Sequence, residues 1–245
     1  MRTLTTRLVA VTGGFAISLG AAACSRSETP TVSSSSLGSG ARTAANGAPA
    51  PADILARAKA NALAATSAAF KGTVSGNGQQ ATIDFKGTTD GQKTDVKISR
   101  VGVGRARFIA FDGAMYIQGD VAFWRLQKAP AKVLANPDKY VRTPSAASAV
   151  ADTLALKPML NKIFAVVSPA DLAPALGGQS VGGVDCWVVT DKKGKGEGAL
   201  YVSKDKLQVV RFTGSASSPG QLDFSKWNED LGIKAPAASQ VMTIG

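Results

Sequence analysis

Apolar residues recur at every second position between residues 70 and 126, in short runs separated by Gly, Asn and Asp. In one such run Ala81, Ile83 and Phe85 alternate with polar neighbours. This alternation predicts strands with one apolar and one solvated face. The short turns between the runs predict consecutive antiparallel hairpins. The expected strands are 70–76, 80–86, 94–100, 105–111, 114–118 and 123–126.

Helical spacing is found on both sides of this block. Before it, Asp53 is placed to cap a helix. The small-residue face of that helix would comprise Ile54, Ala58, Ala62, Ala65 and Ala69. After it, residues 145–176 carry apolar residues at helical spacing behind Ser145, interrupted by Pro158 and Pro169, so we predict two or three short helices. Strands are expected to resume at 184–190, 199–203, 207–213, 222–227 and 240–244.

This order of elements, with short connections between the strands, predicts an α+β domain. We expect one large curved antiparallel sheet wrapped over a few helices. A sheet of this size tends to curl, and a curled apolar face under small-faced or broken helices can enclose a hydrophobic cavity. The predicted lining residues are Ile83, Phe85, Val96, Ile98, Phe108, Met115, Ile117, Leu160, Ile163 and Phe164.

The first two dozen residues predict export. Arg2 and Arg7 precede an apolar run, and three alanines lead into Cys24, which is the order typical of a signal peptide. The residues around Cys24 also resemble a bacterial lipobox, in which the cysteine is acylated. The alternative is a signal cleaved near Ala23 that leaves a free cysteine.

The segment behind Cys24 is rich in Ser, Thr, Ala, Gly and Pro and shows no hydrophobic period, a composition typical of a flexible tether. We therefore expect three regions. They are a lipoprotein signal peptide at 1–23, a tether at 24–51 that begins with acylated Cys24, and a single lipid-binding-like domain at 52–245.

The charge of the chain favours an anionic neighbour. Removing the signal would leave a net charge of +9, because the chain carries +11 and loses only Arg2 and Arg7. A phospholipid surface, an acidic glycolipid or a cell-wall polymer would fit such a charge. The basic residues are scattered, apart from a cluster at Lys192, Lys193 and Lys195, and they do not interleave with aromatic residues. We therefore expect no nucleic-acid partner.

The absence of histidine excludes several classes of enzyme. Ser-His-Asp and Cys-His catalysis and histidine-ligated zinc or haem are all ruled out. Ser203 and Lys206 match the S-x-x-K spacing, but no K-T-G accompanies them, and we interpret the match as chance. We interpret Cys186, in a strand-like run, as a core residue. The sequence thus predicts no enzyme activity, no catalytic residue, no metal and no cofactor.

The arrangement as a whole resembles a known family. It consists of the anchor at Cys24, the tether, the helix at 53–69, the hairpin strands, the central helical insert, and closing strands that end near Asp223-Phe-Ser-Lys-Trp227. This arrangement resembles the mycobacterial lipoproteins LppX, LprG, LprA and LprF, whose fold is similar to that of the LolA and LolB carriers. The resemblance implies a half-barrel over helices, a cavity for acyl chains, and movement of lipids from the cytoplasmic membrane toward the outer envelope. Of the functional residues only Cys24 is carried over, as the acylated anchor.

Three hypotheses follow. The first is a lipoprotein anchored on the extracytoplasmic face of the cell membrane that carries lipid or glycolipid acyl chains, with a membrane transporter as a candidate partner. The second is a tethered interaction or sensor module without lipid cargo, which binds a protein or an anionic wall polymer through Lys192, Lys193 and Lys195. The third is an enzyme that uses carboxylate or Ser-Lys chemistry, neither of which requires histidine. Its candidate residues would be Asp84, Asp95, Asp112, Asp185 and Asp223.

Overall fold

The computed structural model describes residues 49–76, 78–143 and 155–242. Within these ranges the helices are α1 (Pro51–Ala64), α2 (Val121–Leu126), α3 (Ala131–Leu134) and α5 (Leu156–Ala165), with 3-10 turns at Pro169–Asp171 and Ala238–Gln240. The strands are β1 (Ser67–Gly76), β2 (Gln79–Thr88), β3 (Thr94–Arg100), β4 (Gly104–Phe111), β5 (Ala114–Gly119), β6 (Tyr140–Thr143), β7 (Gly177–Val181), β8 (Val184–Asp191), β9 (Gly194–Ser203), β10 (Val209–Thr213), β11 (Gln221–Ser225) and β12 (Val241–Met242).

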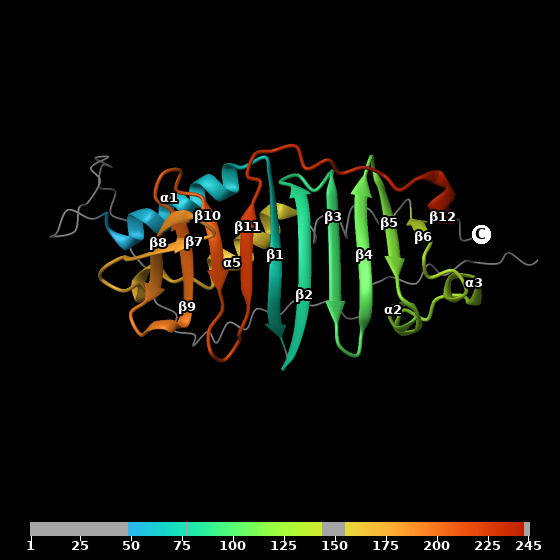
Figure 1. Ribbon diagram of the computed structural model, residues 1–245, viewed down its shortest axis with the longest axis horizontal. Coiled ribbons are helices and arrows are strands. Elements are labelled where there is room, and N and C mark those ends of the chain that lie inside the picture. The colour runs from blue at the N-terminus through green and yellow to red at the C-terminus, as the bar shows by residue number, and fades with distance from the viewer. Residues whose placement is uncertain (1–48, 77, 144–154, 243–245) are drawn as a thin grey trace, which may run out of the picture.

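The strands form one sheet in the order β12-β6-β5-β4-β3-β2-β1-β11-β10-β9-β8-β7 (Figure 1). Two meanders, β1 to β6 and β7 to β11, meet where β1 pairs with β11. The backbones of β1 and β11 come close at this joint, because Gly72 has no Cβ atom. A Cβ atom there would collide with the carbonyl of Gln221. The neighbouring strands are antiparallel except for β12 and β6, which are parallel. The structure confirms the α+β class and the curved, largely antiparallel sheet.

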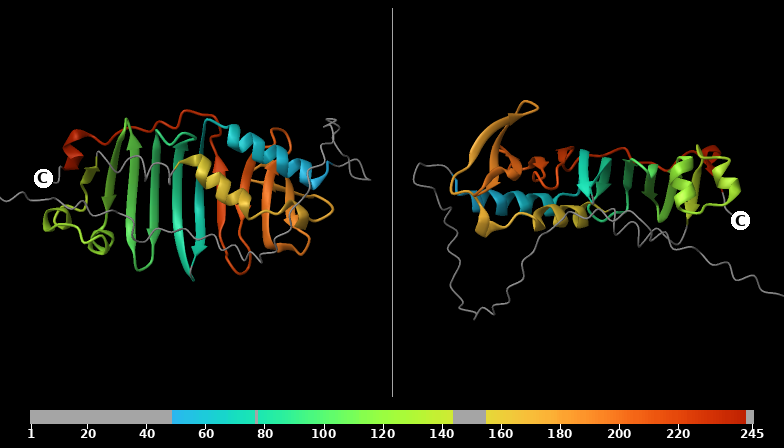
Figure 2. Two further views of the ribbon diagram at one scale, coloured as in Figure 1. Left: turned by 180° about the vertical axis from the view of Figure 1, so that it is seen from behind. Right: turned by 90° about the horizontal axis from the view of Figure 1, so that it is seen from below.

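One face of the sheet is continuously apolar. Strand register aligns a row of buried residues across seven strands, namely Val141, Ile117, Phe108, Val96, Phe85, Phe70 and Phe224. Helices α1 and α5 lie side by side across this face (Figure 2). The buried residues Phe123 and Val133 bring α2 and α3 into the same core. The core therefore lies between a single sheet face and the helices.

The opposite face carries a charged ladder. The register places Gln118, Arg107, Lys97, Asp84, Lys71, Asp223 and Arg211 in one row. Lys71 pairs with Asp84 at 3.4 Å, and Arg211 pairs with Asp223. Arg107 donates to both carboxylate oxygens of Asp95 at 2.8 Å, and these hydrogen bonds raise the pKa of Arg107. Opposite charges on neighbouring strands support the pairing of those strands.

The prediction of a strand at 123–126 is wrong, since these residues belong to helix α2. The carboxylate of Asp120 accepts a hydrogen bond from the Phe123 amide at 2.9 Å, so Asp120 is the N-cap of this helix. Phe123 and Trp124 are consecutive and both buried, whereas a strand with one solvated face would bury only every second residue.

The helix boundaries also differ from the predicted ones. The N-cap position of helix α1 is Ala50, which makes no side-chain cap, whereas Asp53 lies in the first turn, and the helix ends at Ala64. Ala69 consequently lies in β1 and not on the predicted helical face. In α5, Pro158 is accommodated in the first turn, where a backbone N–H has no intrahelical acceptor to lose. Ser145 lies outside the described residues.

Candidate functional site

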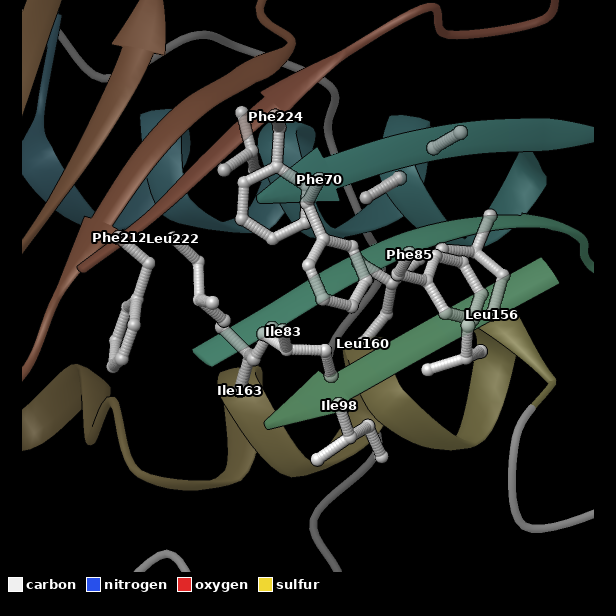
Figure 3. Close-up of a cluster of buried hydrophobic side chains, with 14 of the residues drawn as sticks. Phe70, Ile83, Phe85, Ile98, Leu156, Leu160, Ile163, Phe212, Leu222 and Phe224 are labelled. Carbon is white, nitrogen blue, oxygen red and sulfur yellow. The ribbon is translucent and has the colours of Figure 1, made fainter. Parts of the chain in front are cut away.

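The ten residues predicted to line a cavity all belong to a single buried apolar cluster. Seven of them come from strands β2 to β5 and three from α5. Figure 3 shows Leu160 and Ile163 of α5 directed toward Ile83 of β2. The structure thus brings the predicted residues together on one side of the sheet. Their role in holding a ligand stays a prediction.

Phe70 is the centre of this cluster. It is fully buried, stacks on Phe85 at a centroid distance of 4.6 Å and an interplanar angle of 11°, and lies 5.2 Å from the ring of Phe224. Phe70, Phe85 and Phe224 come from β1, β2 and β11 respectively (Figure 3). The aromatic contacts therefore join the two meanders on the apolar face.

Helix α1 is held against the second meander by polar as well as apolar contacts. Its buried residues include Ala58 and Ala62, whose small side chains let a helix lie close to its neighbours. On the same helix, the Asn61 amide donates to the carbonyls of Lys206 and Leu207 at 3.1 and 3.2 Å. The helix is therefore fixed to the turn between β9 and β10.

Two buried polar atoms on the apolar side have no hydrogen-bond partner among the described residues. They are the hydroxyl of Thr94 and the indole N–H of Trp124. Thr94 is only 1% exposed and Trp124 7%. An unpaired buried polar group costs free energy, so these two atoms lower the stability of the apolar side.

Replacing Thr94 by valine is expected to raise the free energy of unfolding by about 1 kcal/mol, because the change removes an unpaired buried hydroxyl and keeps the shape of the side chain. Urea denaturation of the lipid-free protein would measure this gain. Thr82→Val, on the solvated face of β2, is the matched control and should change stability by less than about 0.5 kcal/mol. A loss of stability in Thr94→Val would show that the hydroxyl has a partner in the folded protein.

A cleft of about 480 Å³ lies beside the C-terminal end of α5. Its apolar floor is formed by Val189, Leu200 and Phe212, which are buried residues of β8, β9 and β10. All three also belong to the central apolar cluster. The cleft is therefore continuous with the apolar side of the sheet.

The rim of the cleft is polar and includes the C-terminal end of α5. The end of this helix contributes Ala165 and Val166, and the other rim residues are Ser168, Thr190, Asp191, Glu197, Ser215, Ser217 and Ser218. Backbone hydrogen bonds hold the surrounding loops, from Ala216 N to Gly196 O at 2.8 Å and from Ala173 N to Thr190 O at 2.9 Å. An apolar floor inside a polar rim suits an amphipathic ligand.

The lysine cluster is partly engaged within the chain. Lys192 pairs with Asp171 at 2.6 Å, which lowers the pKa of Asp171. Lys195 donates to the Gln179 side chain at 2.9 Å and lies over the ring of Tyr201. Lys193 is exposed. Two of the three lysines thus already have partners.

The structure also places the other residues that the sequence singled out for catalysis. The Ser203 hydroxyl accepts a hydrogen bond from the Gln208 amide at 3.1 Å, and Lys206 is exposed in the following turn. Of the five candidate carboxylates, Asp84, Asp95 and Asp223 are in the ion pairs of the charged ladder. The structure does not gather the carboxylates of Asp112 and Asp185 with these three.

Cys186 is a buried residue, as the sequence predicts. It is fully buried in a small apolar cluster on the outer side of β7 to β9, together with Val188 and Tyr201. Burial raises the pKa of its thiol, which favours the unreactive protonated form.

The anchor prediction falls outside the part of the chain that the structure describes. Residues 1–23, Cys24 and most of the tether precede residue 49. Within the described ranges, none of the helices has the length and apolar character needed to cross a bilayer. Over the same ranges, His, Cys, Asp and Glu side chains form no group of three or more that could hold a metal ion.

Similar proteins were found among solved structures. No protein-family model matches the chain, and no curated protein matches it. The crystal structure of LprF from Mycobacterium bovis is 14% identical, covers 77% of this chain and 97% of its own, and has a TM-score of 0.49. The lipoprotein LppX of Mycobacterium tuberculosis is 12% identical, covers 75% of this chain and 98% of its own, and has a TM-score of 0.44.

A third similar structure is the complex of MucA with MucB from Pseudomonas aeruginosa, with 16% identity, coverage of 78% of this chain and 60% of the matched chain, and a TM-score of 0.29. Two of the lipoproteins that the sequence resembles, LprF and LppX, are thus among the solved structures to which this chain is similar.

Proposed function

We propose that this chain is an envelope lipoprotein whose folded domain binds acyl chains of a lipid or glycolipid and carries them across the cell envelope. The acyl chains would lie between the apolar face of the sheet and α5. The polar headgroup would remain at the rim of the cleft, near Ser168 and Ser215. A membrane transporter remains a candidate partner for loading or release.

The observation that supports this proposal is the cleft at the end of α5, which opens onto the apolar face. Its volume of about 480 Å³ falls in the range of roughly 300–1,000 Å³ that is typical of small-molecule sites. Its floor residues Val189, Leu200 and Phe212 are continuous with the buried cluster. An acyl chain entering there would contact these floor residues and could extend toward the other apolar residues of the cluster.

Acylated Cys24 and the tether at 24–51 would hold the domain on the extracytoplasmic face of the cell membrane. A single acyl chain holds a protein only weakly, with about 0.8 kcal/mol per buried methylene, whereas the several chains of a bacterial lipoprotein would anchor it durably. The tether would allow the domain to reach cargo away from its anchor.

Extraction of the purified protein with organic solvent, followed by mass spectrometry, tests the proposal. We expect acyl lipids in an amount comparable to that of the protein. A protein of similar size purified from the same cells serves as the control for adhering lipid. Clean extracts from several preparations, together with no uptake of a fluorescent fatty acid, would overturn the proposal and leave the interaction module as the better hypothesis.

A further inference from the structure

The antiparallel order of the strands gives the sheet two ends at which its turns gather. The turns after β1, β3, β8 and β10, and the entry into α2 after β5, lie at one end, which we name the lower end after its place in Figure 1. The turns after β2, β4, β7 and β9 lie at the opposite, upper end. The two ends can therefore present different surfaces.

Exposed apolar side chains concentrate at the lower end. Among the described residues the large exposed hydrophobic side chains are Val101, Leu126, Val166 and Val184, with exposed fractions of 87%, 55%, 39% and 38%. The first three are found in the β3–β4 turn, at the end of α2 and beside the cleft, all at the lower end. Only Val184 follows a turn at the upper end. The three most exposed of these side chains thus belong to segments at one end of the sheet.

The β3–β4 turn and α2 form a fixed unit. The Arg105 amide donates to the carboxylate of Asp120 at 2.9 Å, and the Asp120 amide donates to the Arg105 carbonyl at 3.0 Å. Gly104 has a φ of +100°, and a Cβ atom on it would collide with the Asp120 carboxylate and lie 2.7 Å from the Phe123 amide nitrogen. The turn and the helix therefore hold Val101 and Leu126 in a set arrangement.

Basic residues lie next to these two apolar residues along the chain. Arg100 and Arg105 flank the β3–β4 turn, and Arg125 and Lys128 flank Leu126. The acidic residue within this unit, Asp120, is occupied as the cap of α2 and as the partner of Arg105 at 3.6 Å. In the turns of the upper end, Asp90, Asp112 and Asp205 are balanced by Lys93, Lys204 and Lys206. The lower end near α2 is thus positively charged around an apolar centre.

We propose that the lower end docks on an anionic phospholipid bilayer, with Val101 and Leu126 inserted in the interface and Arg100, Arg105, Arg125 and Lys128 against lipid phosphates. Apolar residues ringed by basic ones have the chemistry of interfacial membrane binding, in which burial of apolar area adds to attraction by anionic lipid. A protein partner would need a shaped, complementary surface, whereas a bilayer accepts two protruding side chains without one.

This docking would bring the cleft near the bilayer, because Val166 and the β10–β11 turn, which line the cleft, lie at the same end of the sheet. The proposal goes beyond cargo binding and does not depend on it. A domain that carries no lipid could still dock in this way.

Vesicle co-sedimentation of residues 24–245 with Cys24→Ala, which lack both the apolar signal and the anchor, tests the docking. We expect binding to vesicles of equal parts phosphatidylglycerol and phosphatidylcholine, weakened by salt, and little binding to phosphatidylcholine alone. Val101→Ser with Leu126→Ser should lower the partition coefficient about tenfold or more. Arg125→Gln and Lys128→Gln should each lower it about fivefold.

Val184→Ser is the matched control, since it removes an exposed valine from the upper end. It should leave vesicle binding unchanged. Equal binding by the Val101→Ser, Leu126→Ser double variant and the parent chain would overturn the proposal. Equal losses of binding in this double variant and in Val184→Ser would do the same, as would no binding of the parent chain to anionic vesicles. Lipid extraction from the same preparations reports separately on cargo, so the two proposals can fail independently.

A labelling experiment gives a second readout that does not depend on affinity. In the Cys24→Ala background, an environment-sensitive fluorophore on Val101→Cys should shift to shorter wavelength when anionic vesicles are added, while the same label on Val184→Cys should not. Cys186 is fully buried and should remain unlabelled in the folded protein. An unchanged spectrum at Val101→Cys with vesicles bound would contradict insertion of this turn.

Discussion

Replacing Phe70 by alanine is expected to lower the free energy of unfolding by about 3–5 kcal/mol, the largest loss that we expect from a single truncation in this chain. Phe70 is fully buried and contacts aromatic rings on both neighbouring strands, Phe85 at 4.6 Å and Phe224 at 5.2 Å. Truncation would leave a cavity at the joint of the two meanders, where the backbones of β1 and β11 are already too close to move inward. Urea denaturation followed by circular dichroism would measure the loss.

Phe111→Ala provides the control for this variant. Phe111 lies at the end of β4 in a small peripheral cluster and is partly exposed, so its truncation should cost about 1 kcal/mol. Equal losses in the two variants would show that the joint between the meanders is not the centre of stability. A loss in Phe70→Ala accompanied by a smaller denaturant dependence would instead indicate that one meander unfolds before the other.

The strands from Gln79 to Gly119 could be predicted because their information is local. Each run alternates, each turn carries Gly or Asp, and each strand pairs with the next one in the chain. That alternation directly predicted that Ile83, Phe85 and Val96 lie on the apolar face of the sheet. Hairpins of this kind can be predicted without knowing the rest of the fold.

Other elements depended on contacts that no local pattern contains. Strand β7, at Gly177–Val181, is mostly exposed and forms only by pairing with β8. The parallel pairing of β12 with β6 joins residues about one hundred positions apart. Helix α2 did have a local signal, since Asp120 stands three residues before Phe123, but the apolar run that follows suits a strand equally well.

The cleft could not have been found from the sequence. Val189, Leu200 and Phe212 belong to three strands, and they meet only because the sheet order places β8, β9 and β10 together under the end of α5. Sequence reasoning placed the candidate site along the first meander instead. The signal available for these residues was the alternation in the closing strands, which shows burial but not proximity to a helix end.

Replacing Ala165 by tryptophan is expected to weaken uptake of a fatty acid about tenfold. Ala165 is the last residue of α5, is exposed, and lines the cleft, so an indole there would occupy space that the acyl chain would otherwise fill. Displacing about two methylenes from apolar contact removes roughly 1.6 kcal/mol at about 0.8 kcal/mol each, and about 1.4 kcal/mol corresponds to tenfold in Kd. Titration with a fluorescent fatty acid would measure the change.

Ala60→Trp separates this effect from the general effect of an added indole. Ala60 is an exposed alanine on α1 and lies outside the cleft, so this variant should bind the fatty acid as the parent chain does. Neither substitution alters a buried residue, and both variants should unfold at the same urea concentration as the parent. If Ala165→Trp takes up the probe with unchanged affinity, acyl chains do not enter beside the end of α5. The entrance must then be sought elsewhere along the apolar face, because the ten buried residues of the first meander and α5 would still belong to one continuous apolar cluster.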